Sequence, residues 1–350
     1  MKLTEIVGKG TMTWQLSKTG GLMTIHNPKS KEEWLALRHR YISSTESSAL
    51  KGMSPYLTPF ELFHAKQQAE PTSFEMSERM EWGLRLEEAV ARAIADEYGV
   101  KVRKLNAYVS RDGTGMGSSF DYEIVGIKDS EALSGDALRA MYNRSGPGIL
   151  EIKCVDWMVW KRHWVTEGDA MEAPPHIELQ VQHQLHCIER EWAAIGVLVS
   201  GNTLRMLVRD RDLEVGQILE DASKQFWRDL KAGKTPPAEM PRDAELIARL
   251  YNFATPDKVL DAQGDSETAQ KVTALCAEYV DMSNVESGAA SRKKAIKGEL
   301  LQLIGDAERV IAADGFTISA GVVAEAEVPA YTRKAYRNFR VSQKKGKNDE

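Results

Sequence analysis

Apolar positions switch repeatedly between helical and strand spacing from residue 31 to about residue 235. Helical spacing predicts one helix that begins at residue 31 and three more over 75–98, 174–190 and 214–232. The stretches with strand patterns are 106–111, 116–125, 149–155 and the pair that flanks the Gly201-Asn202 turn, which predicts a β-hairpin. This order of elements predicts a mixed α/β fold with a central mixed β-sheet flanked by helices.

Changes in composition mark the ends of this core. The first 24 residues are weakly patterned and Gly-rich, and Gly233 with Pro236 and Pro237 ends a helix at the other side. The predicted regions are an N-terminal extension at 1–24, a core domain at 25–235 and a mainly helical accessory region with a basic tail at 236–350.

Other stretches lie outside the periodic pattern of the core. Residues 126–148 are polar with several glycines, which predicts a surface insertion. Residues 241–312 are charged and mainly helical with a Gly/Ser-rich break near 283–291, and we assign them an accessory or oligomerisation role. The tail is either solvated or contacts phosphate or protein through Arg333, Lys334, Arg337, Arg340, Lys344, Lys345 and Lys347.

The strand at 149–155 has one apolar and one charged face. Side chains alternate along a strand, so Leu150, Ile152 and Cys154 share one face. Glu151 and Lys153 share the other. A surface ion pair is the ordinary interpretation of such a pair.

A second carboxylate lies on a neighbouring strand. In the run GSSFDYEIV, Asp121 alternates with apolar residues, so it lies on a polar face as Glu151 does. Two carboxylates on one surface can hold Mg²⁺, which takes one or two carboxylates together with waters and phosphate oxygens. Lys153 beside them could stabilise developing charge or orient an attacking water.

Two predicted helices carry polar residues close to their apolar faces. Glu87 shares its side with Val90 and Ile94, so we expect it to point inward, where a metal, a metal-bound water or Lys153 would satisfy it. A helix rotated slightly would leave Glu87 at the boundary instead. Gln180 flanks the apolar stripe of the helix that begins near 174, and a buried, satisfied amide is the ordinary alternative there.

Five spaced motifs occur in one order along residues 31–235. They are LRHRYISSTESSALKG with Arg38 and Thr45, WGLRLE ending at Glu87, SSFDY with Asp121, EIKC with Glu151 and Lys153, and QVQH with Gln180 and Gln182. The set resembles the YqaJ-type viral recombinase, phage lambda exonuclease-like family of the PD-(D/E)xK nuclease superfamily. Phe120 stands where the family has Pro, and Thr45 where it has Ser.

The resemblance implies a restriction-endonuclease-like core and a Mg²⁺ site that Mn²⁺ is able to occupy. Asp121, Glu151 and the backbone carbonyl of Ile152 would ligate the metal. Glu87 would reach a second ion or its waters, and Lys153 would activate the attacking water.

The resemblance also implies a substrate and partners. Gln180 would help to hold the scissile region, Arg38 and Thr45 would bind a 5′-phosphate, and Gln182 would contact DNA. The implied activity is 5′ to 3′ degradation of one strand of linear double-stranded DNA. The implied partners are a single-strand annealing protein and further copies of the chain in a trimer.

Charge and cysteine content change this picture little. The net charge of −5 neither supports nor excludes DNA as the substrate, because basic groups can be confined to one channel. Three scattered cysteines cannot form a disulfide framework or a four-cysteine cluster. The chain contains no apolar run long enough to span a membrane and no signal-peptide pattern, so we expect a cytoplasmic phage or prophage protein in a bacterial host.

Two residue groups and two function classes remain as alternatives. A metal site at His163, His176, His183 and His186 lacks the cysteine or carboxylate of a zinc pattern, so polar surface roles are favoured. Trp157, Trp160 and Trp164 have helical spacing, which favours the core over stacking on bases. The alternative functions are a catalytically inactive DNA-end-binding or scaffold subunit and a restriction endonuclease; the complete set of acidic and Lys positions disfavours the first.

Overall fold

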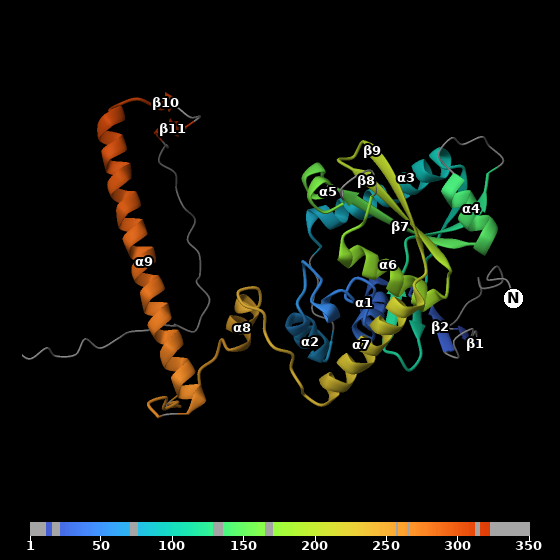
Figure 1. Ribbon diagram of the computed structural model, residues 1–350, viewed down its shortest axis with the longest axis horizontal. Coiled ribbons are helices and arrows are strands. Elements are labelled where there is room, and N and C mark those ends of the chain that lie inside the picture. Colours follow the sequence, from blue (N-terminus) through green and yellow to red (C-terminus); the bar gives the residue numbers. More distant parts are fainter. Residues whose placement is uncertain are drawn as a thin grey trace, which may run out of the picture. The chain divides into compact units, whose positions relative to one another are not determined.

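The computed structural model describes residues 12–15, 22–70, 76–128, 136–164, 171–256, 258–264, 266–311 and 316–322 (Figure 1). The chain divides into two compact units, Met1–Leu246 and Ile247–Glu350. The first unit extends past the boundary predicted near residue 235 because the segment after the two prolines is tied to it. Thr58 Oγ1 donates to Asp243 Oδ1 at 2.6 Å, and Arg242 Nη2 donates to the Ser54 carbonyl at 2.9 Å.

A five-stranded sheet forms the centre of the first unit, in the order β3-β6-β7-β8-β9. Its strands are β3 (Val100–Lys104), β6 (Tyr122–Ile127), β7 (Gly148–Val155), β8 (Trp192–Val199) and β9 (Thr203–Asp210). β7 and β8 run parallel, while the other neighbouring pairs run antiparallel. The sheet is therefore mixed, as the sequence pattern predicts.

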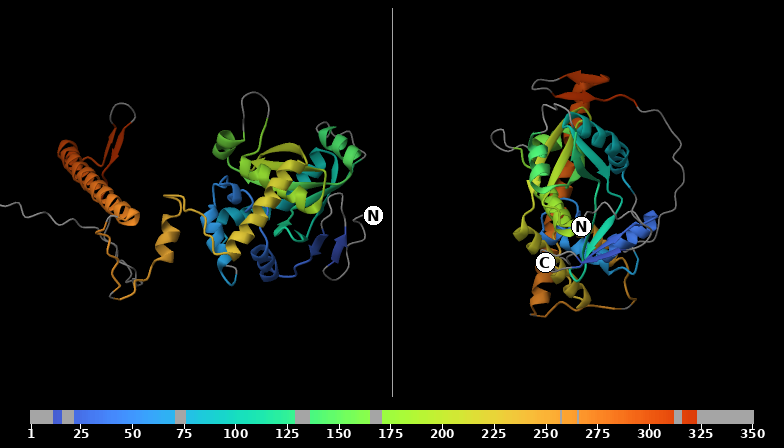
Figure 2. Two further views of the ribbon diagram at one scale, coloured as in Figure 1. Left: turned by 60° about the horizontal axis from the view of Figure 1, so that its bottom comes forward. Right: turned by 90° about the vertical axis from the view of Figure 1, so that its right-hand side faces the viewer.

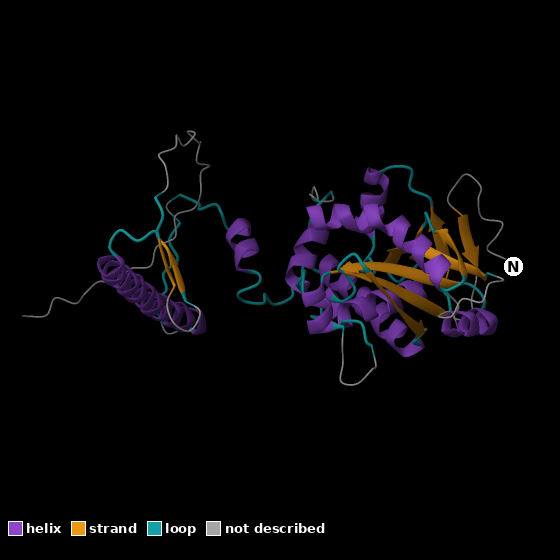
Figure 3. Cartoon of the chain, turned by 90° about the horizontal axis from the view of Figure 1, so that it is seen from above, coloured by secondary structure: helices purple, strands orange, loops and turns teal. Residues whose placement is uncertain are grey.

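A four-stranded antiparallel sheet lies in the same unit (Figure 3). Its strands are β1 (Met12–Gln15), β2 (Leu22–His26), β4 (Tyr108–Arg111) and β5 (Met116–Ser119). The N-terminal extension predicted over 1–24 thus contains β1 and the start of β2. Met23 and Ile25 alternate along β2 and pack in the core with Val109 and Met116, which is why this segment joins the sheet.

Helices cover both faces of the five-stranded sheet. α3 (Glu78–Glu97) and α4 (Asp136–Ser145) pack on the face that carries Leu150 and Ile152. α6 (Pro175–Ile188) shares its core with Ile149, on the opposite face, and also contacts β4 and β5 of the second sheet. α6 is therefore enclosed by strands of both sheets.

The expected polar insertion contains a helix. Residues 129–135 lie outside the described residues, but α4 follows at once, and Leu138 and Met141 in it are buried. These two apolar residues are three apart, so they lie on one helical face that packs on the sheet. The prediction of a purely polar surface segment is wrong for this part.

The first unit also contains several shorter helical segments and one long helix. They are α1 (Lys31–Arg40), the 3₁₀ turn η2 (Ala49–Lys51), α2 (Pro59–Gln67), α5 (Trp157–His163) and α7 (Leu213–Lys231). A separate small core joins Ile42, Leu62, Phe63 and Phe226. Figure 2 shows the same elements from two further directions.

The second unit is dominated by one long helix. α8 (Ala244–Leu250) spans the division, and α9 (Glu267–Ile304), β10 (Arg309–Ile311) and β11 (Thr317–Ser319) follow. The break predicted near 283–291 is wrong, because α9 runs through it. The glycine in that stretch, Gly288, costs only about 1 kcal/mol in a helix. The basic tail lies outside the described residues. In the described part of the chain, no helix is long and apolar enough to cross a membrane.

Candidate functional site

Asp121 lies at the point where two strands separate. The sequence pattern suggests one strand over 116–125, but β5 ends at Ser119 and β6 begins at Tyr122 in the other sheet. Asp121 lies in this bend, and its Oδ2 accepts a hydrogen bond from the Ile152 backbone N–H at 2.8 Å. The bond places the Asp121 carboxylate beside the middle of β7.

Glu151 and Lys153 of β7 lie on the face covered by α6, and two glutamines of α6 contact them. Lys153 Nζ donates to Glu151 Oε1 at 2.6 Å and to Gln180 Oε1 at 3.1 Å. Gln180 Nε2 donates to Glu151 Oε1 at 2.6 Å, and Gln184 Nε2 donates to Glu151 Oε2 at 2.7 Å. Both carboxylate oxygens of Glu151 are thus held, and its side chain is 4% exposed. This is not the exposed surface pair that the strand alone suggests.

Gln184 lies outside the QVQH motif, although it flanks the apolar stripe of this helix as Gln180 does. It also donates to the Ser119 carbonyl at 3.3 Å, so it links the end of β5 to Glu151 on β7. The available signal was its spacing: Gln184 is four residues after Gln180, which puts both amides on one side of α6.

The electrostatics of the cluster reflect crowded, buried charges. Burial, together with the negative charge of Glu151, raises the pKa of Asp121 well above its usual range. Burial alone would lower the pKa of Lys153, but the carboxylates of Glu151 and Asp121 outweigh it and raise that pKa. The three groups therefore form one electrostatic unit.

Glu87 points inward from α3, as its helical phase predicts, with its side chain 12% exposed. Its partner differs from those expected: Lys104 Nζ of β3 lies 3.2 Å from Glu87 Oε1. Glu87 still contributes to the raised pKa of Asp121. It therefore lies at the edge of the carboxylate cluster rather than in contact with Lys153.

Gln182 faces a different part of the molecule. Its Nε2 donates to the Asp210 carbonyl at 2.9 Å, and its Oε1 accepts from the Asp212 backbone N–H at 2.8 Å. It therefore fastens α6 to the junction of β9 and α7 and does not join Glu151. Both ends of the Gln182 amide thus have partners within the chain, and its role toward DNA stays a prediction.

The predicted 5′-phosphate residues lie together at the end of α1. Arg38 Nη2 donates to Thr45 Oγ1 at 3.0 Å, and the guanidinium lies over the Trp34 ring, 4.8 Å from its centroid. Trp34 Nε1 in turn donates to Ser119 Oγ at 2.8 Å, at the end of β5. The pair is thereby connected to the strand that leads into Asp121.

The tryptophans after β7 divide into two groups. Trp160 of α5 (Trp157–His163) and Trp164 are buried and stacked with ring centroids 5.4 Å apart, so the core interpretation is confirmed for both. Trp157 is 58% exposed.

The histidines do not gather into a metal site. His183 is buried and bonds through Nε2 to the Gly117 carbonyl at 3.1 Å, while His186 bonds Glu220 at 2.8 Å. Neither is a helix-surface residue, which corrects the favoured surface role. Among the described residues, no group of three or more His, Cys, Asp or Glu side chains is arranged to hold a metal ion.

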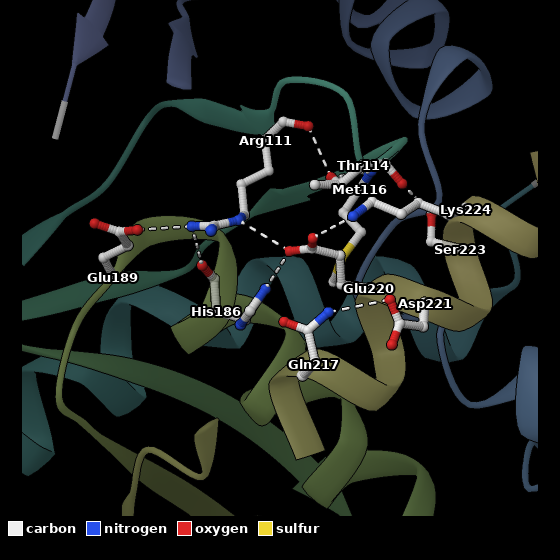
Figure 4. A network of polar contacts seen from close by, with 10 residues as sticks. All are labelled: Arg111, Thr114, Met116, His186, Glu189, Gln217, Glu220, Asp221, Ser223 and Lys224. Carbon is white, nitrogen blue, oxygen red and sulfur yellow. Dashed lines mark hydrogen bonds and ion pairs between the residues drawn. The ribbon is translucent and has the colours of Figure 1, made fainter. Parts of the chain in front are cut away.

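An ionic network holds the C-terminal end of α6 in place (Figure 4). Arg111 Nη1 donates to Glu189 Oε1 at 2.7 Å, and Glu220 Oε2 of α7 lies 2.8 Å from His186 Nε2. Lys224 Nζ donates to the other Glu220 oxygen at 2.7 Å. The network ties β4, α6 and α7 together, which fixes the helix that carries Gln180 and Gln184.

The donor set fits a hard divalent cation. Asp121 and Glu151 supply carboxylate oxygens, and Mg²⁺ is bound by as few as one or two carboxylates plus substrate oxygens, so a third acidic ligand is not required. Burial and the charge of Glu151 raise the pKa of Asp121, so its carboxylate carries a negative charge more easily with a cation beside it. The same crowding would be relieved by a bound metal ion.

Comparison with known proteins now bears on this site. Residues 33–191 match the family model described as the YqaJ-like viral recombinase domain. The resemblance to this family is confirmed. The matched segment contains Arg38, Asp121, Glu151, Lys153 and Gln180. The chain is also similar to the uncharacterized protein YqaJ of Bacillus subtilis (strain 168), with 27% identity over 289 residues that cover 81% of this chain and 82% of that protein.

Solved structures with similarity to this YqaJ-like chain include two exonucleases. An alkaline exonuclease (LHK-Exo) from Laribacter hongkongensis is 19% identical, covers 62% of this chain and 100% of its own, and gives a TM-score of 0.42. A phage related exonuclease from Haemophilus somnus 129PT is 14% identical, covers 59% and 91%, and gives 0.34. Similarity at this level carries no conclusion about activity.

Proposed function

We propose that this YqaJ-like protein is a Mg²⁺-dependent deoxyribonuclease that degrades one strand of linear duplex DNA from a 5′ end. The observation that carries the proposal is the cluster of Asp121, Glu151 and Lys153, enclosed by α6 within the segment that matches the recombinase family. A surface ion pair would not need two buried glutamines to hold one carboxylate.

In this proposal, different residues of the cluster bind the metal, activate the attacking water and position Lys153. Asp121, Glu151 and the Ile152 carbonyl would hold the metal, with Glu87 close enough to affect the charge at Asp121. Bound Mg²⁺ or Mn²⁺ would act as a Lewis acid toward phosphate oxygens and lower the pKa of water. Lys153 would donate a hydrogen bond to the attacking water or to a phosphate oxygen, and Gln180 keeps the ammonium in place.

Arg38 and Thr45 support the proposed direction of degradation, which starts at the 5′ end. A guanidinium and a hydroxyl side by side are suited to a terminal phosphate, because both donate hydrogen bonds to its oxygens. Recognition of a 5′-phosphate there would favour degradation from the 5′ end and leave a 3′ overhang for a single-strand annealing protein.

The decisive experiment follows end-labelled linear duplex DNA with Mg²⁺ and with EDTA, next to a closed circular duplex. We expect Mg²⁺-dependent loss from linear ends, faster with a 5′-phosphate than with a 5′-hydroxyl. Lys153→Met should abolish it, whereas Lys161→Met, at an exposed position of α5, should not. Binding to DNA ends without degradation in Mg²⁺ or Mn²⁺ would instead establish an inactive end-binding subunit, and cutting of circular DNA would establish an endonuclease.

A further inference from the structure

α9 leaves large apolar side chains exposed along most of its length. The helix has 38 residues, and within the described part of the chain Ala269 is its single buried residue. Leu275, Met282 and Leu303 are 55%, 58% and 82% exposed. Helices in proteins owe most of their stability to packing of an apolar face, so α9 requires a covering surface.

Most of these side chains follow a heptad seam, while Val285 and Leu301, which are also exposed, lie beside it. Steps of three and four residues alternate along Val272, Leu275, Tyr279, Met282, Glu286, Ala289, Lys293, Ile296, Leu300 and Leu303. This alternation is the a/d pattern through which two helices form a coiled coil. Glu286 and Lys293 are the charged members of the seam, and they lie one heptad apart in its middle.

Charge excludes a parallel pair of two such helices. In a parallel coiled coil each a or d residue faces the same residue of the other chain. Glu286 would then face a second Glu286, and Lys293 a second Lys293. Both contacts are repulsive and lie in the middle of the seam.

An antiparallel pair that overlaps over the whole helix removes this repulsion. Val272 then faces the second copy's Leu303, Leu275 faces Leu300, and Tyr279 faces Ile296, so the end layers are apolar. Glu286 faces the second copy's Ala289, and in the adjacent layer Met282 faces the second copy's Lys293. Because helical side chains lean toward their own N-terminus, Glu286 and that Lys293 lean toward each other, and the two-fold symmetry gives the contact twice.

We propose that α9 pairs with the α9 of a second copy of this chain as an antiparallel coiled coil, joined in the middle by Glu286–Lys293 contacts between the copies. The observations that select a second copy are the complementary charges in the middle of the seam and the apolar match of its end layers. The inference does not depend on the proposed nuclease activity.

Light scattering on the full chain after size exclusion tests the pairing. Lys293→Glu makes the middle of the seam wholly acidic, and Glu286→Lys makes it wholly basic, so each alone should halve the native mass. A mixture of the two variants should recover it, as should the double variant E286K/K293E. Lys294→Glu is the matched control, because it makes the same charge change at an exposed position beside the seam.

Cross-linking tests the direction of the helices. In a Cys276→Ser background, chains with Tyr279→Cys and chains with Ile296→Cys should form a disulfide with each other when mixed and oxidised. A disulfide between two Tyr279→Cys chains would show a parallel pair and overturn the proposal. The pairing requires an even number of chains, which is two for a dimer or six if the implied trimer also forms. A wild-type mass of one or three chains, or an unchanged mass for Lys293→Glu with helix content retained by circular dichroism, would overturn the proposal as well.

Discussion

α6 and α9 both carry polar residues next to apolar ones, but the surroundings of the two helices are opposite. α6 has 14 residues, ten of them buried, and packs with strands of two sheets. In α9, 38 residues long, the described contacts bury only Ala269. The polar groups of α6 therefore have defined partners within the chain. For α9 we propose instead that the seam packs against the same seam of a second copy, which runs antiparallel to it.

The comparison shows that the surfaces packed around a helix determine what its similar side chains contact. Gln180, Gln182 and Gln184 are alternate residues of one helix, yet the first and third hold Glu151 and the second holds the start of α7. In α9 the charges at Glu286 and Lys293 have to be interpreted from spacing alone. The following experiments separate the enclosed helix from the exposed one.

The largest effect should come from the carboxylate that α6 surrounds. Glu151→Gln keeps the shape of the side chain but removes the charge that faces Lys153 and the metal. We expect the single-turnover rate of DNA degradation to fall on the order of 10²–10³-fold, comparable to the loss of one key electrostatic group. The native mass, which we assign to α9, should not change. A Gln variant with nearly full activity would contradict the site assignment.

Acid should weaken the enclosed helix through His183. Burial lowers the pKa of His183 to about 4 from about 6.5, so the unfolded state binds the proton more strongly than the folded state. The unfolding free energy is then unaffected by this group above pH about 6.5 and decreases as the pH falls toward 4, by up to about 3 kcal/mol.

Urea unfolding of wild type and His183→Gln at neutral and acidic pH measures this contribution. The Gln variant retains a donor for the Gly117 carbonyl but does not titrate, so its stability should decrease less on acidification. Equal losses in the two proteins would show that His183 does not cause the pH dependence.

The two glutamines of α6 should differ in what their removal changes. Gln184→Ala frees Glu151 Oε2, and we expect metal affinity by calorimetry, and with it the Mg²⁺ response, to weaken about 10–100-fold. Gln182→Ala should instead lower stability by about 1 kcal/mol without changing metal affinity, because its partners are Asp210 and Asp212. Identical metal binding in the two variants would remove Gln184 from the site.

Substitution of one glycine near α6 and one in α9 should change the unfolding free energy in opposite directions, with the smallest effects of the series. An added Cβ at Gly216 of α7 would clash with His186 of α6, so Gly216→Ala should destabilise the first unit by about 1–3 kcal/mol. Gly298 of α9 lies away from the seam with open space around it, and Gly298→Ala should stabilise its helix by about 0.5–1 kcal/mol. Thermal unfolding followed by circular dichroism distinguishes the signs, and a stabilising Gly216→Ala would contradict the packing of α6 on α7.

Local pattern was sufficient for the order of the elements and for the faces of each. The alternation in ILEIKCV put Glu151 and Lys153 on one face, helical phase turned Glu87 inward, and the spacing of Arg38 and Thr45 matched the family motif. These properties depend on the periods of 2.0 and 3.6 residues, which neighbouring residues along the chain express without long-range contacts.

Partners across the chain required the fold. Three contacts join residues that are distant in sequence: Asp121 with Ile152, Gln184 with Glu151, and Glu87 with Lys104. Periodicity states which way a side chain points, but the group it meets depends on which surface packs against that face. For the enclosed α6 the structure supplies that surface, and for α9 we infer that a second copy does.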